Sequence, residues 1–443
     1  MRFLILLIDF IIICGLSNTP LLFMNTAVGL IPSILITVIL TIAFITVNII
    51  PGSYKVRKTR LKILAGGSDL LMIFLHATTA DALIFILMLI TGGYDLWQYI
   101  VYAVVAVVIC AVTFWNGIIR VYLTSGQLGF RLRVLGAMFG MFPLINILFL
   151  FRIIAKTQKE AAYEIRHDAV EAARAGKNIC ATKYPILLVH GVFFRDRNIF
   201  NYWGRIPEAL TLNGAEIYYG NQQSALSVKD SAAELATRIE EVIKETGAEK
   251  LNIIAHSKGG LDTRYALSVY GCGKYAASLT TINTPHRGCI FVDKIFDNLS
   301  EQTQKKLADA YNAAAVVRGD STPDFIAAVG DLRESRCIEM NKSVPDCEGV
   351  FYQSVGSVSK GVRSGRFPMD ISYPFVKKTD GENDGLVSVD SMKWGEKFHF
   401  ISTNGKRGVT HSDVIDLNRE NIEDFDVREY FVQLVAELKN NGF

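Results

Sequence analysis

A serine between small residues follows an apolar run near the middle of the chain. The pentapeptide Ala255–Gly259 reads AHSKG, and it lies directly after Leu251–Ile254 and before a helix-forming stretch. Small residues two positions before and two after a serine allow a sharp strand-to-helix turn that exposes its Oγ. Ala255 stands where this motif usually has glycine, and a methyl group is compatible with the turn. The pattern predicts that Ser257 is an activated nucleophile.

A serine nucleophile needs an imidazole that accepts its proton. After Ser257 the chain offers only His286, His399 and His411. Where such a serine turn follows a strand of a mostly parallel sheet, the expected order along the chain is serine, acid, histidine. His286 precedes every acid candidate, and His399 alternates with apolar neighbours as a strand residue would. His411 lies in a polar loop before the last helical stretch, so we expect it to be the base.

The imidazole needs a carboxylate to orient it, and the oxyanion needs N–H donors. Asp384 lies on an Asn-Asp-Gly turn between apolar runs and is the favoured acid, with Asp380 and Asp390 as alternatives. A plain Asx turn with the following glycine is the competing interpretation of Asp384. The backbone N–H groups of Val192 and Lys258 are the expected oxyanion donors, because one follows His-Gly and the other follows the serine.

Alternating strand and helix patterns surround these residues. Such alternation predicts a mostly parallel sheet with helices on both faces, whose sites form at the carboxyl ends of the strands. The expected strands are residues 184–189, 215–219, 251–255 and 277–282, and the expected helices are 203–212, 231–246 and 259–270.

Six segments, in order, are similar to the bacterial true lipases of the Pseudomonas, Burkholderia and Bacillus kind, over about residues 182–440. The resemblance implies an α/β-hydrolase fold that cleaves carboxylic esters of lipids, with Ser257, Asp384 and His411 as the triad and Val192 and Lys258 as the oxyanion hole. The segments are Lys183–Gly191, Tyr202–Pro207, Ala255–Tyr265, Leu279–Gly288, Asn383–Val387 and His411–Asp413.

The resemblance carries two further expectations. Some of these lipases bind a structural calcium ion through an aspartate two residues after the catalytic histidine, which is Asp413 here; a helix cap is the alternative role. No other cofactor is expected. Residues 289–348 stand where these lipases carry a lid, and their apolar side chains at helical spacing suit either a lid or a permanently packed helical insertion.

The first 160 residues have a different composition. They hold 12 Lys/Arg and 5 Asp/Glu, a net of +7, which leaves −4 for the rest of a chain of formal charge +3. Nothing in this balance suggests a nucleic-acid partner. A membrane-spanning helix needs about 20 mostly apolar residues. Five such runs predict an all-α, polytopic transmembrane region over 1–154: residues 3–23, 27–50, 69–91, 97–118 and 134–153.

Charged, alanine-rich residues 155–182 predict a helical linker to a hydrolase domain at 183–443. A cleaved signal peptide is the competing interpretation of the first run, which lacks an A-x-A-like site. Five basic residues between 55 and 62 place that loop in the cytoplasm. A fifth crossing would then put the hydrolase domain outside the cytoplasm, whereas a re-entrant turn at 140–143 would keep it inside.

The remaining features are open to two interpretations each. Cys337 and Cys347 could form a disulfide in an exported domain or remain free thiols. His76 and Asp81 stand in one apolar run, where a helix-packing contact is favoured over a transport role.

These patterns together predict a membrane-anchored serine lipase or esterase that acts on lipid or acyl-ester substrates through an acyl-enzyme. An acyltransferase or thioesterase with the same triad, or a non-catalytic membrane-bound binding module, are the alternatives. The sequence does not indicate an oligomeric state.

Overall fold

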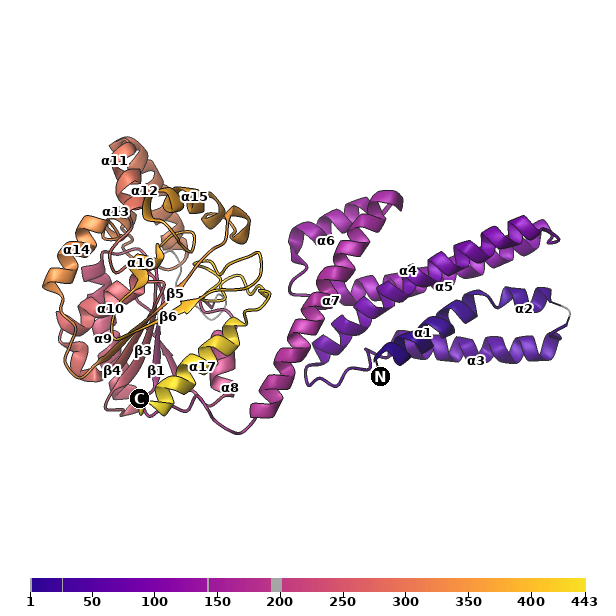
Figure 1. Cartoon of the computed structure of the whole chain (residues 1–443), viewed down its shortest axis with the longest axis horizontal. Coiled ribbons are helices and arrows are strands. Elements are labelled where there is room, and N and C mark those ends of the chain that lie inside the picture. Colours follow the sequence, from indigo (N-terminus) through magenta and orange to yellow (C-terminus); the bar gives the residue numbers. More distant parts are fainter. Residues whose placement is uncertain (1, 26, 142, 193–200) are drawn as a thin grey trace. The chain divides into compact units, whose positions relative to one another are not determined.

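The computed structural model describes residues 2–25, 27–141, 143–192 and 201–443. The chain forms two compact units, Met1–Ala173 and Arg174–Phe443. The first is entirely helical within its described residues, and the second contains a six-stranded sheet (Figure 1).

Within the described residues, three helices of the first unit are long and apolar enough to cross a membrane: α3 (Leu30–Ile49), α4 (Thr59–Thr91) and α5 (Leu96–Thr124). Helices α4 and α5 pack closely because glycines lie at their contact. A Cβ on Gly67 would stand 2.6 Å from the Cβ of Arg120, and one on Gly117 would stand 2.9 Å from Leu71. Small residues of this kind let membrane helices approach each other's backbones.

The first and fifth apolar runs are not continuous helices. The first divides into α1 (Arg2–Ser17) and α2 (Pro20–Met24), because a proline cannot donate the backbone hydrogen bond that would continue the helix. The fifth divides into α6 (Gly129–Met138), the 3₁₀ turn η1 (Phe139–Met141) and α7 (Pro143–Arg174). Helix α7 also contains most of the expected linker, so the linker is continuous with the apolar segment before it.

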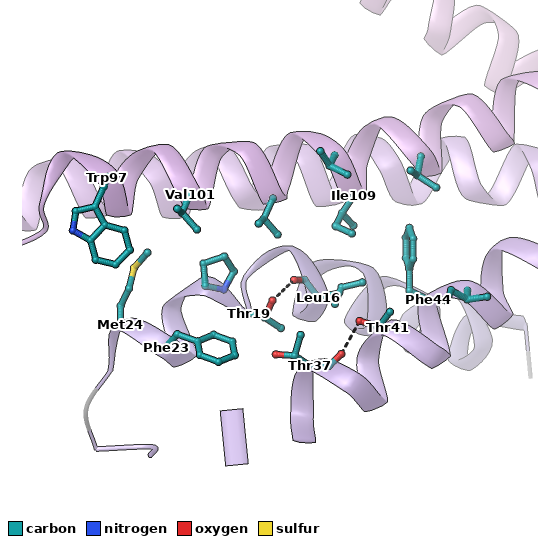
Figure 2. Close-up of a pocket in the computed structure, with 15 residues that line it drawn as sticks. Leu16, Thr19, Phe23, Met24, Thr37, Thr41, Phe44, Trp97, Val101 and Ile109 are labelled. Carbon is teal, nitrogen blue, oxygen red and sulfur yellow. Dashed lines mark hydrogen bonds between the residues drawn. The ribbon is translucent and has the colours of Figure 1, made fainter. Parts of the chain in front are cut away.

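The break between α1 and α2 borders a cavity of about 570 Å³ (Figure 2). Leu16, Phe44 and Ile109 contribute to its apolar walls. Its threonine hydroxyls donate to backbone carbonyls, as Thr41 Oγ1 does to Thr37 O at 2.7 Å. The cavity is therefore an apolar gap between helices.

His76 and Asp81 of α4 form hydrogen bonds to different partners. Asp81 is buried and accepts hydrogen bonds from Ser17 Oγ at 2.9 Å and Asn18 Nδ2 at 2.8 Å. His76 Nδ1 bonds to Met72 O within its own helix at 2.8 Å. Asp81 thus joins α4 to the broken end of α1, which is the helix-packing role that the sequence favours.

The second unit has six parallel strands in the order β2-β1-β3-β4-β5-β6. This confirms the predicted fold class, an α/β-hydrolase type of sheet that follows an N-terminal helical region. The strands are β1 (Ile186–Val189), β2 (Ile217–Tyr219), β3 (Leu251–His256), β4 (Ala276–Ile282), β5 (Phe351–Ser357) and β6 (Lys397–Ile401).

Two apolar clusters cover the two faces of this sheet. Helices α8 (Ile206–Leu212) and α17 (Val427–Asn440) pack on one face through residues such as Leu210 and Phe431. Helices α9 (Val228–Thr246) and α10 (Lys258–Ser268) pack on the other through Leu235 and Leu267. A short turn, η2 (Cys272–Tyr275), leads from α10 into β4.

Four helices fill the insertion predicted at 289–348: α11 (Ile290–Asn298), α12 (Glu301–Val317), α13 (Phe325–Gly330) and α14 (Glu334–Ser343). Further segments, η3 (Val362–Ser364), α15 (Met369–Asp380) and α16 (Val389–Met392), follow β5. Cys337 and Cys347 are free thiols, and Cys337 Sγ donates to Asp331 O at 3.4 Å.

Candidate active site

Ser257 occupies the turn between β3 and α10 with φ 55° and ψ −131°. Residues other than glycine rarely adopt a positive φ, and backbone strain of this kind is common at catalytic positions. The turn is tight enough to require glycine beside it: a Cβ on Gly259 would stand 2.3 Å from His190 O. The local backbone therefore forms the elbow that the sequence predicts.

Ser257, His411 and Asp384 lie in one hydrogen-bonded line. His411 Nε2 is 2.9 Å from Ser257 Oγ, and His411 Nδ1 is 2.7 Å from Asp384 Oδ2. The His411 backbone N–H also donates to Asp384 O at 3.0 Å, which fixes the two loops to each other. The structure thus brings together the three residues expected for the triad.

The Asp384 carboxylate is fully buried and surrounded by donors. Its Oδ1 accepts the N–H groups of Leu386 and Val387, each at 2.8 Å. Its Oδ2 accepts Asn283 Nδ2 at 2.6 Å in addition to the imidazole. Asp384 therefore makes both the Asx turn and the contact to His411, because Oδ1 accepts the N–H groups of the turn and Oδ2 accepts the imidazole.

The expected oxyanion donors lie on either side of the nucleophile. Lys258 begins α10, where the first N–H groups of a helix have no partner within the helix. Its side chain turns into the protein, where Nζ is 2.7 Å from Asp262 Oδ1 and 2.9 Å from Ser231 Oγ. Val192 is the last described residue before 193–200 and lines the same cavity as Ser257. Their joint action on an oxyanion stays a prediction.

A tyrosine supports this loop in a way that the sequence did not indicate. The Gly191 N–H donates to Tyr202 Oη at 3.0 Å, and the same oxygen is 2.6 Å from His256 Nδ1. The His256 ring lies 4.5 Å from the His411 ring. Burial lowers the pKa of His256 well below its usual value, so this imidazole is neutral beside the base.

A cavity of about 480 Å³ opens above Ser257 and His411. Helices α11 and α13 supply much of its wall, and α15 supplies another part. None of the described residues that line it is Asp, Glu, Lys or Arg. Its apolar walls include Val292, Ile295, Phe296, Leu299, Ile326, Val329, Phe367, Met369, Leu386 and Ile415. Residues of the predicted lid region thus line the cavity that contains the nucleophile. The role of this region as a lid stays a prediction.

Comparisons with known proteins find sequence relatives among bacterial lipases. No family model matches the chain. A triacylglycerol lipase of Burkholderia plantarii is 32% identical over 189 residues, which are 40% of this chain and 52% of that protein. One of Vibrio cholerae is 29% identical over 259 residues, 52% of this chain and 82% of that protein.

The resemblance to bacterial triacylglycerol lipases is confirmed. The chain spans about half the length of the first two curated relatives, 52% and 55%. Among solved structures, the Staphylococcus hyicus lipase is similar with a TM-score of 0.47 and 16% identity, over 59% of this chain and 97% of that one. The mature Bacillus licheniformis lipase BlEst2 has a TM-score of 0.43 and 21% identity, over 57% and 92%.

Asp413, the residue that the resemblance offers as a calcium ligand, has protein partners at both carboxylate oxygens. Asp413 Oδ1 accepts Arg407 Nη2 at 2.8 Å, and Oδ2 accepts Thr410 Oγ1 at 2.6 Å. Within the described residues, no group of three or more His, Cys, Asp or Glu side chains is placed to hold a metal ion. The residues at this position therefore do not fit calcium, because Arg407 and Thr410 already donate to the two oxygens of the carboxylate.

The other candidates have separate roles. His286 is buried, bonds to Thr281 Oγ1 at 2.9 Å and stacks on Trp394. His399 lies on β6 and bonds to Gln353 Oε1 at 3.1 Å, as a strand residue would. The carboxylate of Asp380 accepts Ile290 N at 3.1 Å, and Asp390 pairs with Lys393. Their hydrogen bonds and ion pairs join them to residues other than Ser257 and His411.

Proposed function

We propose that this chain is a membrane-anchored serine hydrolase that cleaves carboxylic esters of lipids. The observation that carries the proposal is the line of hydrogen bonds from Ser257 through His411 to Asp384 at the base of an apolar cavity. A non-catalytic binding module would have no need for a strained serine in this line.

The geometry supports acyl transfer in two steps. His411 Nε2 takes the Ser257 proton as Oγ attacks the ester carbonyl, and Asp384 stabilises the imidazolium that forms. The N–H groups of Val192 and Lys258 hold the oxyanion of the tetrahedral intermediate. His411 then returns the proton to the leaving alcohol. A water molecule activated by His411 hydrolyses the acyl-enzyme and frees Ser257.

The apolar lining of the cavity supports an acyl chain as the part of the substrate that binds there. Burial of apolar surface stabilises bound hydrocarbon by about 25 cal/mol per Å². A phosphate or carboxylate would gain no ion pair from the described lining residues, because they carry no lysine or arginine. We therefore assign the acyl part of the ester to the cavity and the polar part to the solvent side.

We infer that the hydrolase unit faces the cytoplasm, contrary to the sequence expectation of a fifth crossing. The basic loop before α4 contacts the last part of α7. Arg57 pairs with Asp168 Oδ1 at 3.2 Å and with Glu171 Oε2 at 3.1 Å. Glu160 of the same helix is 3.5 Å from Arg60 and accepts Gly126 N at 2.8 Å, just after α5 ends.

These contacts support a common side for three parts of the chain: the basic loop, the end of α5 and the end of α7. Helix α6 has 10 residues, which span about 15 Å and are too few to cross the hydrocarbon core. The segment from α6 to α7 then enters the membrane and returns on one side. Because basic loops remain in the cytoplasm, the unit that begins at Arg174 lies there too.

A panel of lipid esters tests the activity with the full chain in membranes. Wild type should release fatty acid from acyl esters, and Ser257→Ala should not. Ser268→Ala, at the far end of α10, should behave as wild type. If released acyl groups appear on an added alcohol or thiol rather than as free acid, the protein is a transferase. Equal hydrolysis by wild type and Ser257→Ala would contradict the proposal.

Protease access tests the orientation. In right-side-out vesicles the hydrolase unit should resist added protease, and in inverted vesicles it should be digested. A C-terminal epitope read by immunoblot reports both results. Digestion of the unit in right-side-out vesicles would place it outside and overturn the cytoplasmic assignment.

A further inference from the structure

The carboxylate two residues after His411 is paired with a guanidinium group. Asp413 is almost fully buried, with 2% of its side chain exposed, and Arg407 Nη2 donates to its Oδ1 at 2.8 Å. A buried carboxylate needs a cation or several donors to offset the loss of hydration. Arg407 supplies that charge from the loop between β6 and the catalytic histidine.

The other oxygen of Asp413 holds the backbone next to His411. Oδ2 accepts both the N–H of Thr410 at 3.1 Å and its Oγ1 at 2.6 Å. The N–H of Asp413 donates back to Thr410 O at 3.0 Å. Thr410 and Asp413 thus bracket His411, and the Asp413 carboxylate holds the backbone that precedes the imidazole.

The remaining nitrogen atoms of Arg407 reach two other segments. Nη1 donates to Glu420 Oε2 at 2.7 Å, and Nε donates to Ser364 O at 2.8 Å. Ser364 ends η3, three residues before Phe367, whose side chain lines the cavity. One guanidinium therefore joins the turn of the catalytic histidine to the wall of the acyl cavity.

We propose that Arg407 is a positioning residue that clamps the catalytic histidine loop, in the place where a structural divalent cation would otherwise bind, so that hydrolysis is independent of calcium. The inference rests on the proposed ester hydrolase function. The planar guanidinium is suited to this role because it carries a positive charge and donates in three directions. A lysine ammonium group has the same charge but lacks the planar, branched set of donors.

Loss of the clamp should misplace the imidazole rather than the substrate. Without Arg407 the buried Asp413 carboxylate has no cation, and its hold on Thr410 loosens. An error of about 1 Å in a catalytic group costs on the order of 100-fold in rate. We therefore expect Arg407→Ala to lower kcat by about 10- to 100-fold with little change in KM, and Arg407→Lys to retain an intermediate kcat.

The experiment combines chelation with chemical rescue, on the full chain in detergent or membranes. Wild type should keep its activity in EGTA. Sub-denaturing guanidinium chloride should restore part of the kcat of Arg407→Ala, whereas sodium chloride at the same concentration should not. Lys406→Gln is the matched control, because it removes the neighbouring exposed cation and should retain wild-type kinetics.

The outcomes separate the clamp from the proposed function. Absence of Ser257-dependent hydrolysis in wild type would refute the ester hydrolase proposal itself. With an active wild type, loss of activity in EGTA that calcium restores would overturn the clamp, as would a wild-type kcat in Arg407→Ala. Should Arg407→Ala not fold, the kcat of Arg407→Lys and the EGTA result decide: a wild-type kcat or chelator sensitivity overturns the inference.

Discussion

Replacement of Asp384 by asparagine is the most informative change to the relay, the hydrogen-bonded line of Ser257, His411 and Asp384. Every described hydrogen-bond partner of the Asp384 carboxylate is a donor. Oδ1 accepts Leu386 and Val387 N–H groups, and Oδ2 accepts Asn283 Nδ2 and His411 Nδ1. An amide of the same shape presents its NH₂ to one of these pairs. If NH₂ faces His411, Nδ1 must accept a hydrogen bond and the neutral imidazole carries its proton on Nε2. Nε2 can then no longer accept the Ser257 proton.

We therefore expect Asp384→Asn to lower kcat by about 10⁴-fold with the fold intact, as in other relays of this geometry. At about 1.36 kcal/mol for each tenfold change, that is roughly 5 kcal/mol of transition-state stabilisation. The assay is ester hydrolysis by the full chain, with the rate of fluorophosphonate labelling as a second readout. Asp390→Asn is the control, because that carboxylate is exposed and pairs with Lys393. An Asp384→Asn rate within tenfold of wild type would refute the assignment of the acid.

Three further changes test the surroundings of the relay. Tyr202→Phe removes the acceptor of the Gly191 N–H and should cost kcat/KM about 1–3 kcal/mol; unchanged kinetics would exclude a positioning role. Gly259→Ala places a Cβ 2.3 Å from a backbone oxygen and should reduce hydrolysis strongly, whereas Gly330→Ala, with no atom within 4 Å, should not; equal effects would contradict the elbow packing. Burial lowers the pKa of His256 and His286 below their usual value, so the unfolded chain binds protons that the folded chain excludes. Their contribution to stability is complete above about pH 6.5 and falls as the pH decreases, by up to about 1.4 kcal/mol per pH unit for each group; a free energy of unfolding, followed by chemical denaturation, that did not decrease from about pH 6.5 to pH 5 would contradict the assignment.

The relay could be predicted from the sequence because each member has a local signature. Ser257 has small neighbours after a buried strand, Asp384 lies on a tight turn, and His411 follows both in chain order. Strands β1, β3 and β4 were also predictable, since short apolar runs between turn residues favour them. The strand ends then bring these loops to one edge of the sheet.

Other parts of the site have no such signature. Tyr202 and His256 are 54 positions apart, and the tyrosine oxygen meets that ring only in the folded chain. Nothing in the sequence around Arg407 distinguishes it from other loop arginines, and its role becomes visible only from its contact with Asp413. Contacts of this kind depend on tertiary packing, which spacing along the chain does not report.

The N-terminal helical unit shows a related limit of hydropathy. An apolar run indicates that a segment suits lipid, and it does not show that the helix is continuous. Pro20 divides the first run, and η1 divides the fifth, although both runs are long enough to span. The expected crossing at 134–153 therefore differs from the observed short helix, turn and long helix.

Intact-protein mass spectrometry after treatment with a fluorophosphonate tests the central claim most directly. The full chain should gain one phosphonyl group, peptide mapping should place it on Ser257, and ester hydrolysis should disappear in proportion to labelling. Ser257→Ala should gain none. Stoichiometric labelling at another residue, or hydrolysis that persists in the fully labelled protein, would contradict the account.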